Sequence, residues 1–464
     1  MTTDARTGHV AVIDIGKTNA KLALVRLPDL AEVAVITRPN AVRPGPPYPH
    51  FDVEGHWQFL LDGLSKFHDA RPISAITVTT HGGAGALIAK DGTLAAPILD
   101  YEHTGPDEIA ADYDAIRPPF AETGAPRLPA GLNLGAQLHW QFRTDLGLRE
   151  RVHRIVTYPQ FWAHRLTGVH ATDVTSLGCH TDLWNPYEGR FSTLPERLGI
   201  AEKIAPPRKP REVLGPILPR IARRTGLPDE TPVHCGIHDS NASLMSHLAA
   251  RKPPFSVVST GTWVIAMGVG GRPVTLDPAR DTLVNVNAFG AAVPSARFMG
   301  GREHDVALNG QHVDAGEADL IGVLTDRVML LPAVVPGTGP FAKAKSRWQG
   351  DEPPHGSARR GAAVGVYLAL VTARCLDLIG HAGPVIVEGP FARNQPFLWM
   401  LGAATSSQVL PMEGTTGTSQ GAAMLAGADR AAQASSAAFP APDARVAALL
   451  SDYARDWDAA TAGG

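Results

Sequence analysis

A segment near the N-terminus, residues 10–25, carries residue types that can bind phosphate and a metal ion. Its pattern predicts a strand, a tight turn and a second strand. Asp14 ends the first strand and can hold Mg²⁺, directly or through water. Gly16 lets the backbone approach an anion closely, and Thr18 and Lys21 offer a hydroxyl and a cation. We therefore predict a phosphate-facing hairpin. An ordinary hairpin, in which turn amides satisfy a buried Asp14, is the alternative.

Asp239 is a second candidate acid. It follows the apolar segment 232–238 and precedes residues 240–243, which resemble the start of a helix. The positive end of the helix dipole keeps a carboxylate ionised there. An ionised aspartate beside a substrate hydroxyl can accept its proton during phosphoryl transfer. Because Asp is also a favoured helix cap, simple capping competes with this interpretation.

Small and hydroxyl-bearing residues recur in the second half of the chain. Residues 259–262 could place hydroxyls and amides on the distal phosphates of a nucleotide. Gly389 and the stretch 417–421 could let a flat base or a ribose lie against the backbone. Tight packing of helix against strand is the competing explanation for each of these small residues.

Two other motifs are considered and not favoured. Gly16-Lys17-Thr18 lacks the earlier glycine of a phosphate-binding P-loop, because that position is Ala11. The segment also lies between two strands and does not open a helix. His234 and His238 lie four residues apart, but the strand pattern and the lack of an indicated third ligand argue against zinc.

The elements that must position these residues repeat within the chain. After the first hairpin, residues 56–67 follow a helical pattern and residues 75–80 a strand that ends in His81-Gly82. A second strand, turn and strand covers residues 255–267. The turn glycines of the two hairpins lie about half the chain apart, which indicates a weak internal repeat. Two related domains facing each other across a cleft are the architecture that this repeat favours.

Composition bounds the class of protein. The chain has 464 residues, 44% of them hydrophobic and 19% charged, which is typical of a folded protein of two or three domains. The net charge of −3 gives no basic footprint for nucleic acid or an anionic membrane. No run approaches a membrane span, and residues 1–6 lack a signal-peptide pattern. Three cysteines cannot form a disulfide framework, so we expect a cytoplasmic enzyme.

The order of these motifs resembles the FGGY family of carbohydrate kinases, in the actin/hexokinase/Hsp70 superfamily. The resemblance runs from Val10 to about Gly427. Five segments carry it: the first phosphate motif at 14–21, the catalytic loop at 236–239, the second phosphate motif at 259–263, the adenosine loop at 388–394, and Gln420-Gly421-Ala422-Ala423. The opening Asp-Ile-Gly-Lys-Thr is similar to the rhamnulose and fuculose kinase-like branches.

The resemblance implies an α/β fold of two ribonuclease-H-like (actin-like ATPase) domains facing a central cleft. Residues 1–240 would form the N-terminal domain, with the sugar side and the first phosphate motif. Residues 241–464 would form the C-terminal domain, with the nucleotide side and a C-terminal helix.

It also implies a site for ATP, Mg²⁺ and a sugar, in which Asp239 is the general base and Asp14 the metal ligand. ATP and its phosphates would be bound by Gly16, Lys17, Thr18, Asn19, Lys21, Thr260, Gly261, Thr262, Gly389, Pro390 and Asn394. The sugar would be bound by His81, Gly82, Tyr101, Glu102, His103 and Asp239. Residues 101–103 stand where xylulose kinases carry Trp-Asn-Asp, and residues 388–390 depart from three glycines.

The resulting hypothesis is an ATP-dependent kinase of a small sugar, either a ketose of the rhamnulose, fuculose, xylulose or ribulose type or a polyol. Its partners would be the sugar and ATP, without nucleic acid or membrane, and a homodimer is one possible assembly. Two alternatives remain: a nucleotide-driven switch of the same superfamily, and a sugar-binding regulator without turnover. An intact Asp239 argues against the second.

Overall fold

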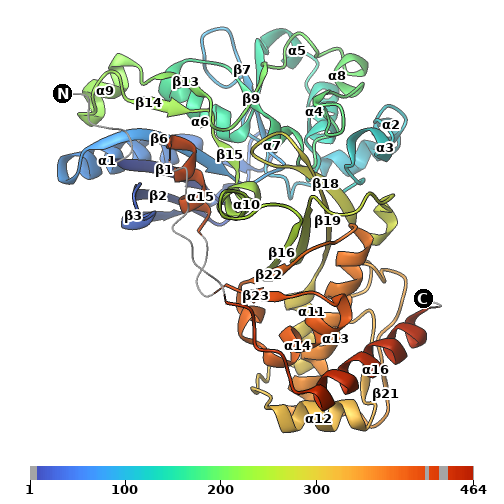
Figure 1. Cartoon of the computed structure of the whole chain (residues 1–464). Coiled ribbons are helices and arrows are strands. Elements are labelled where there is room, and N and C mark those ends of the chain that lie inside the picture. The colour runs from blue at the N-terminus through green and yellow to red at the C-terminus, as the bar shows by residue number, and fades with distance from the viewer. Residues whose placement is uncertain (1–7, 413–416, 428–436, 463–464) are drawn as a thin grey trace. The chain divides into compact units, whose positions relative to one another are not determined.

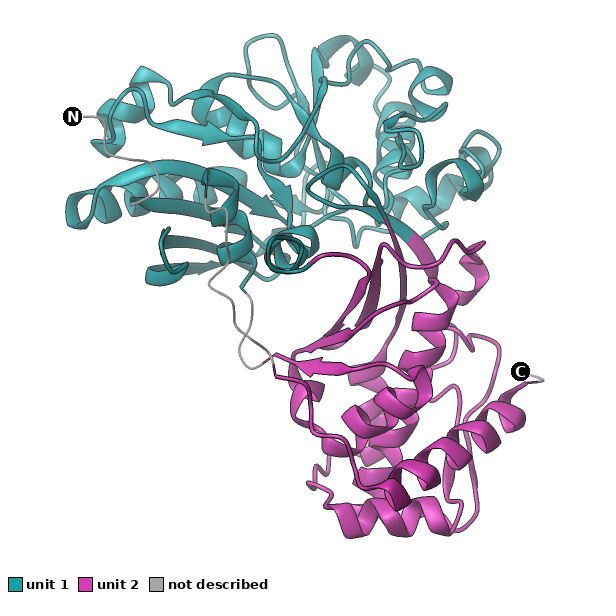
Figure 2. Cartoon of the chain, in the orientation of Figure 1, with its two compact units in different colours: residues 1–251, 284–292, 416–433 teal, residues 252–283, 293–415, 434–464 magenta. Residues whose placement is uncertain are grey.

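A computed structural model describes residues 8–412, 417–427 and 437–462 (Figure 1). The chain divides into two compact units, coloured separately in Figure 2. Unit 1 comprises residues 1–251, 284–292 and 416–433, and unit 2 comprises residues 252–283, 293–415 and 434–464. The predicted boundary at 240/241 falls within helix α10 (Asp239–Ala250). The expectation about residues 1–6 lies outside the described residues.

Unit 1 is built on a mixed sheet with strand order β13-β14-β6-β1-β2-β3, in which β15 also pairs with β6. Strands β1, β2 and β3 form an antiparallel meander, and β1, β6 and β15 run parallel. The strands of this unit are β1 (His9–Ile15), β2 (Asn19–Arg26), β3 (Ala31–Pro39), β4 (Val42–Arg43), β5 (His50–Phe51), β6 (Ile73–Thr80), β7 (Gly85–Ile88), β8 (Arg154–Thr157), β9 (Thr172–Asp173), β10 (Trp184–Asn185), β11 (Arg190–Phe191), β12 (Pro207–Arg208), β13 (Val213–Pro216), β14 (Pro232–His234) and β15 (Ile237–His238).

Helices cover both faces of this sheet, which explains why β1 and β6 are buried almost throughout. The helices of unit 1 are α1 (Val53–Ala70), α2 (Ala110–Asp114), α3 (Phe120–Thr123), α4 (Leu134–Thr144), α5 (Leu148–Arg151), α6 (Tyr158–Thr167), α7 (Val174–Leu177), α8 (Leu194–Arg197), α9 (Pro219–Thr225), α10 and α15 (Thr418–Ala423), with the 3₁₀ turns η1 (Gly105–Ile109) and η4 (Met424–Ala426).

The two faces of β1 belong to different core clusters. Ala11, Ile13 and Ile15 pack with the buried residues of α1 and α6. Val10 and Val12 pack with residues of α10 and α15. Side chains alternate along a strand, so Asp14 emerges on the face that α10 covers. The fold therefore directs this carboxylate towards the helix that begins with Asp239.

Unit 2 repeats the strand pattern of unit 1. Its main sheet has the order β18-β19-β17-β16-β22-β23. Here β19, β17 and β16 are antiparallel neighbours and β16, β22 and β23 run parallel, as β3, β2, β1, β6 and β14 do in unit 1. Gly16 and Gly261 follow the equivalent strands β1 and β16. The weak repeat expected from the sequence therefore reflects two sheets of one topology.

The strands of this second sheet and its small hairpin are β16 (Phe255–Thr260), β17 (Val264–Val269), β18 (Thr282–Val286), β19 (Ala292–Phe298), β20 (Met329–Leu331), β21 (Arg347–Gln349), β22 (Val385–Glu388) and β23 (Val409–Pro411). The helices are α11 (Gly300–Leu308), α12 (Glu317–Thr325), α13 (Ala358–Leu378), α14 (Gln395–Thr405) and α16 (Ala444–Thr461), with the 3₁₀ turns η2 (Pro278–Arg280) and η3 (Pro390–Arg393).

Helix α13 is the central helix of unit 2. By length and composition it could cross a membrane, but 78% of its most apolar window is buried inside the protein. It packs against α14, α12 and α11, and Tyr367, Leu368 and Leu376 join the core of the unit. These contacts account for its hydrophobicity as that of a core helix. Helix α16 begins after Asp443, whose carboxylate accepts a hydrogen bond from the Val446 amide at 2.8 Å.

Candidate functional site

The carboxyl ends of three parallel strands bring the chemistry-bearing residues of unit 1 to one edge of the sheet. Ile15 of β1 lies opposite Thr80 of β6, and Thr80 lies opposite His238 of β15. Asp14, His81 and Asp239 stand at or next to these three positions. Ligands of open α/β sheets bind at this edge.

Asp14 is a mostly buried carboxylate in this row. Its side chain is 14% exposed and lies 3.5 Å from Lys21 Nζ, which also contacts Glu32 at 3.3 Å. Burial raises the pKa of Asp14 to about 6; the charge of Lys21 lowers it and that of Asp239 raises it further. The carboxylates of Asp14 and Asp239 together offer oxygen ligands of the kind that Mg²⁺ prefers. Its ion-pair partner is Lys21, and within the described part of the chain no turn amide donates to it as the ordinary-hairpin interpretation expects.

The predicted phosphate turn is closed by backbone and side-chain hydrogen bonds. The Gly16 amide donates to the Asn19 carbonyl at 2.9 Å, and Thr18 and Asn19 are exposed. Asn40 donates from Nδ2 to the Gly16 carbonyl at 2.8 Å, and its Oδ1 lies 2.7 Å from His56 Nε2. These hydrogen bonds fix the backbone of the turn and leave Thr18 and Asn19 accessible to a ligand.

Lys17 lies with the loop that follows β7. Its ammonium pairs with Asp100, lies 3.1 Å from Glu102, and stands 4.8 Å above the ring of Tyr101. Tyr101 and Glu102 are predicted for the sugar side of the site, whereas Asp100 is not. A phosphate contact for Lys17 stays a prediction.

His81 combines complete burial with an unsatisfied nitrogen. Its Nδ1 pairs with the Gly82 carbonyl at 2.9 Å, and its Nε2 has no hydrogen-bond partner among the described residues. The rings of Phe51, Tyr101 and Tyr158 surround it at centroid distances of 5.0–5.2 Å. Burial lowers the pKa of His81, so the imidazole is neutral. An unpaired buried polar atom costs about 1–3 kcal/mol, which a ligand hydroxyl would recover.

The three residues of the 101–103 loop face different surroundings. Tyr101 packs edge-on against His81, and Glu102 pairs with Lys17. His103 packs against the rings of Trp140 and Tyr48. The structure thus brings Tyr101 and Glu102 to His81 and Lys17, and sets His103 in a neighbouring aromatic cluster. Sugar contacts by these residues stay predictions.

Asp239 is the first residue of α10. The N-cap position is occupied by His238, so Asp239 is not the capping residue that the alternative interpretation requires. Its Oδ1 accepts a hydrogen bond from the Ser240 amide at 2.6 Å and lies 3.1 Å from His238 Nε2, a distance at which a protonated imidazole forms an ion pair with it. The side chain is 32% exposed. A substrate hydroxyl can therefore reach a carboxylate whose orientation is already fixed, as a general base requires.

A buried histidine and cysteine stand behind Asp239. The Sγ of Cys179 lies 3.6 Å from His238 Nε2, and the Asn241 amide lies 3.2 Å from His238 Nδ1. Burial lowers the pKa of His238, but the charges of Cys179 and Asp239 outweigh it and raise the pKa to about 9. Burial raises the pKa of the Cys179 thiol, but the charges of His180 and His238 outweigh it and lower the pKa to about 5.

The Asn241 side chain is consistent with a protonated His238. As placed, its nitrogen faces His238 and its Oδ1 has no partner within the described part of the chain. Turning the amide over would let Oδ1 accept the second N–H of an imidazolium. The Cys179 sulfur and the Asp239 carboxylate both face the other ring nitrogen, Nε2, and their charges favour the protonated ring, so we take His238 as an imidazolium.

Gly82 packs against the buried pair of His238 and Cys179. A Cβ added there would lie 2.9 Å from His238 Nε2 and 3.0 Å from Cys179 Sγ. A side chain at this position would push against both members of the pair. Packing therefore explains why a glycine follows β6 at this position, in addition to the sugar contact that is predicted for it.

Unit 2 contains a cavity of about 960 Å³ whose lining includes Gly261, Thr262, Pro390 and Asn394. Four of the residues predicted to bind nucleotide thus line one space of suitable size. Thr260 is different, because its hydroxyl is already used: it donates to the Glu388 carbonyl and accepts from the Phe391 amide at 3.2 Å. A phosphate contact by Thr260 stays a prediction.

Gly389 and Gly421 have close backbone neighbours that explain their lack of a side chain. A Cβ on Gly389 would lie 2.0 Å from the Thr260 carbonyl oxygen, and one on Gly421 would lie 1.8 Å from that of Ala242. Tight packing, the competing explanation, accounts for both glycines. A nucleotide contact by Gly389 stays a prediction.

Several residues of the site were not found from the sequence: Asn40, Asp100, Cys179 and Asn241. Asn40 and Asp100 act in loops, where no periodicity marks a residue. Cys179 is 59 positions from the histidine it meets. Asn241 did carry a signal, because it follows Asp239 by two residues at a helix start, where its side chain turns back towards His238.

Comparison with known proteins assigns both halves of the chain. Residues 9–246 match the N-terminal domain of the FGGY family of carbohydrate kinases, and residues 252–435 match the C-terminal domain of carbohydrate kinase FGGY. The L-fuculokinase of Escherichia coli (strain K12) is 31% identical over 279 residues, 56% of this chain and 56% of that protein. That alignment therefore covers little more than half the length of this curated relative.

Solved structures agree over the full length. A carbohydrate kinase from Novosphingobium aromaticivorans is 37% identical, covers 99% of both chains and superposes with a TM-score of 0.91. A xylulose kinase from Rhodospirillum rubrum, 21% identical, covers 98% of both chains with a TM-score of 0.77 and so shares the fold. The α/β fold class and the family predicted from the motifs are confirmed. The chain belongs to the FGGY family of carbohydrate kinases.

Proposed function

We propose that the chain transfers the γ-phosphoryl group of ATP to a hydroxyl of a small sugar, either a ketose of the rhamnulose, fuculose, xylulose or ribulose type or a polyol. One observation carries the proposal. Asp14 and Asp239, with the neutral His81, lie at the same edge of the unit 1 sheet, and the charge of Asp239 raises the pKa of Asp14. One carboxylate can serve the metal while the other serves the hydroxyl.

Asp239 is the general base in this mechanism. It accepts the proton of the attacking hydroxyl as the bond to phosphorus forms, and the ion-pair contact with His238 helps to hold the carboxylate in place. A positioned base is worth about 10²–10⁴ in rate. The hydrogen bond from the Ser240 amide holds the carboxylate of Asp239 in one orientation.

Asp14 would hold Mg²⁺, which supplies neutralisation of the phosphate charge when bound. Lys21 partners Asp14, and the exposed Thr18 and Asn19 offer polar groups to the phosphates. In unit 2, Gly261, Thr262, Pro390 and Asn394 line the cavity that we assign to ATP.

The chemistry around His81 supports a polyhydroxylated substrate. His81 Nε2 and the Asp239 carboxylate offer a buried polar nitrogen and a base from neighbouring strand ends, and the loop residue Tyr101 adds a phenol beside His81. Lys17 and Glu102 add charged groups beside them. Sugars and polyols present several hydroxyls in one small volume, which suits such a set. The three free, buried cysteines support a reducing, cytoplasmic location.

The decisive experiment is coupled ADP release with Mg-ATP against a panel of ketoses, polyols and aldoses. Release that depends on one sugar, and that falls by at least about 10²-fold in Asp239→Asn, supports the proposal. Asp229→Asn, which removes an exposed carboxylate elsewhere, is the matched control and should leave the rate unchanged. Sugar-independent ATP hydrolysis would instead favour the nucleotide-driven switch, and sugar binding without turnover the regulator.

A further inference from the structure

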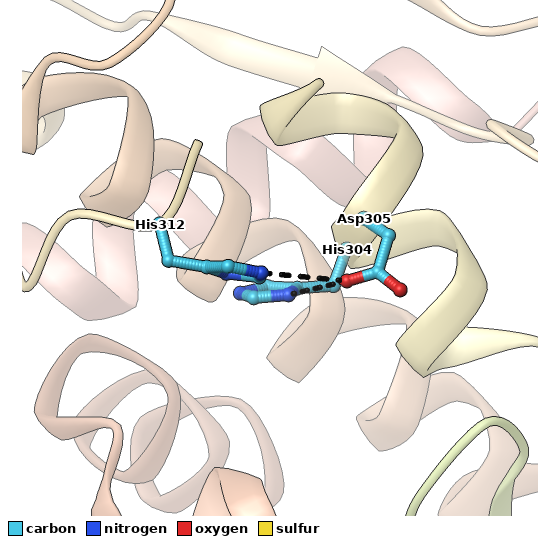
Figure 3. Close-up of side chains that lie close together, drawn as sticks. All are labelled: His304, Asp305 and His312. Atoms are coloured by element: carbon cyan, nitrogen blue, oxygen red, sulfur yellow. Dashed lines mark ion pairs between the residues drawn. The ribbon is translucent and has the colours of Figure 1, made fainter. Parts of the chain in front are cut away.

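Three metal-ligating side chains meet in unit 2, in the wall of the 960 Å³ cavity. His304 and Asp305 come from α11, and His312 comes from the loop that follows it. Their ligand atoms all lie within 4.8 Å of one another. His304 Nδ1 and His312 Nε2 lie 3.6 Å and 3.7 Å from the same oxygen of Asp305, as Figure 3 shows.

These separations are close to those of a coordinated ion. A tetrahedral Zn²⁺ with ligands at about 2.0–2.2 Å holds them about 3.4 Å apart. Small rotations of exposed side chains are enough to reach that spacing, because the side chains of Asp305 and His312 are 57% and 59% exposed. His304, whose side chain is 18% exposed, is held by the ring of Phe391 and supplies the fixed member of the set.

The donor set selects the class of metal. Two imidazole nitrogens and one carboxylate oxygen are borderline ligands that suit Zn²⁺, Co²⁺ and Ni²⁺. Mg²⁺ prefers oxygen ligands and keeps its water, so it suits the Asp14 site and not this one. Three protein ligands leave one position of a tetrahedron open to water or to a cavity ligand.

The two imidazoles turn towards one acceptor. Their rings stack at 4.9 Å with an interplanar angle of 22°, and both nitrogens turn to the same Asp305 oxygen (Figure 3). The three ligand atoms therefore converge, as the ligands of one bound ion do.

We propose that His304, Asp305 and His312 form a binding site for a transition-metal dication of the zinc class. The site opens on the cavity of unit 2 and is separate from the carboxylates of unit 1. Because it is defined by its own ligands, it stands whether or not the chain proves to be a sugar kinase.

The test is a calorimetric titration of the full chain, freed of metal with a chelator, with Zn²⁺ alone. One equivalent should bind. His312→Ala and Asp305→Asn should each weaken binding by at least about tenfold, since loss of even an outer-shell partner costs 10–100-fold. His355→Ala, an exposed histidine of the same unit outside the cluster, is the matched control and should bind as the parent chain does.

A spectrum of the Co²⁺-loaded chain identifies the ligands independently. Nitrogen and oxygen ligation should give visible d–d bands without the near-ultraviolet band of cobalt–thiolate bonds, and His312→Ala should lose the visible bands. Circular dichroism checks that the variants remain folded. Absence of Zn²⁺ binding, binding unaltered in His312→Ala, or a thiolate band would each overturn the proposal.

Discussion

At the scale of single residues, each of the two acids of the site contacts a basic side chain. Asp14 contacts Lys21, and Asp239 contacts His238, which in turn contacts Cys179. The two aspartates and Lys21 were predicted from the sequence, because the aspartates end apolar strands and Lys21 lies in the same hairpin as Asp14. The pairing of Cys179 with His238 follows from the fold alone, since the loop after α7 and strand β15 are 59 residues apart at this contact.

Replacing Cys179 should change the pH dependence of catalysis. The thiolate helps to hold the proton on His238, whose pKa is raised to about 9. In Cys179→Ala that pKa falls, so the imidazolium that orients Asp239 is lost at a lower pH. We expect the alkaline limb of the kcat profile to move to lower pH.

The matched control is Cys375→Ala, which removes a buried thiol of the unit 2 core and should leave the limb in place. In Cys179→Ser the hydroxyl is a neutral hydrogen-bond partner for His238. The alkaline limb of this variant should therefore lie between those of Cys179→Ala and the parent chain. A profile for Cys179→Ala identical to that of the parent chain would show that the thiolate has no part in orienting the base.

The ionised carboxylate of Asp14 should lower the free energy of unfolding, although the proposed activity requires it. Its pKa in the folded chain, about 6, lies above the ordinary value of 3.8. Folding therefore favours the neutral form, and the free energy of unfolding falls as pH rises from about 4 through 6. At pH 7.5 without Mg²⁺, Asp14→Asn should raise the free energy of unfolding by about 2–3 kcal/mol.

The gain should shrink to about 0.5 kcal/mol at pH 4 and vanish below about pH 3, where the carboxyl is protonated in both the folded and the unfolded chain. Urea unfolding at pH 4 and pH 7.5 measures it. The same variant should lose the Mg²⁺-dependent activity, as expected where a functional site trades stability for function. A variant that is less stable than the parent at pH 7.5 would contradict the burial argument.

At the scale of elements, the approach of α15 to α10 fixes the helix that carries Asp239. The two helices touch where Gly421 faces the Ala242 carbonyl, and Ala422 and Met424 join the core cluster of β1. A side chain at Gly421 cannot be accommodated by rotation of a neighbour, because the obstacle is backbone.

Gly421→Ala should therefore destabilise the chain by about 3 kcal/mol, at the upper end of overpacking effects. It should also raise KM or lower kcat, because α10 must shift to make room and Asp239 begins α10. Thermal unfolding monitored by circular dichroism gives the first effect and steady-state kinetics the second. Gly322→Ala in α12, whose nearest neighbour lies 3.7 Å away, is the matched control and should be neutral or stabilising.

The elements themselves were largely predictable, and the loops between them were not. The hairpin of β1 and β2, the strand β6 and the helix α1 all carry apolar patterns of clear period. Asp100 and Asn40 sit in connections where no period applies, although both fix charged or polar groups of the site. Asp239 was placed at a helix start, but sequence alone does not separate a capping aspartate from a first helical residue.

At the scale of the whole molecule, the order of segments along the chain is not the order of the units. Residues 284–292 and 416–433 return to unit 1 after the chain has begun unit 2. Val286 packs with Leu177 and Leu183 in one core cluster, and Met424 and Leu425 pack with Val12 in another. The repeat of strand topology therefore applies to the two sheets. The hydrophobic clusters around them include residues from distant parts of the sequence.

A chain cut after Arg251 should therefore fail to form a native unit 1. It lacks Val286, which fills the space beside Gly178, and α15, which covers β1 and β6 on the α10 face. We expect the truncated chain to keep helical far-ultraviolet dichroism, bind the dye ANS, and lose near-ultraviolet dichroism and cooperative unfolding. Adding residues 252–464 as a separate chain should restore part of the near-ultraviolet signal, because they supply both missing segments. Cooperative unfolding of residues 1–251 at the midpoint of the full chain would show instead that the first sheet and its helices suffice, and that the returning segments only decorate a finished core.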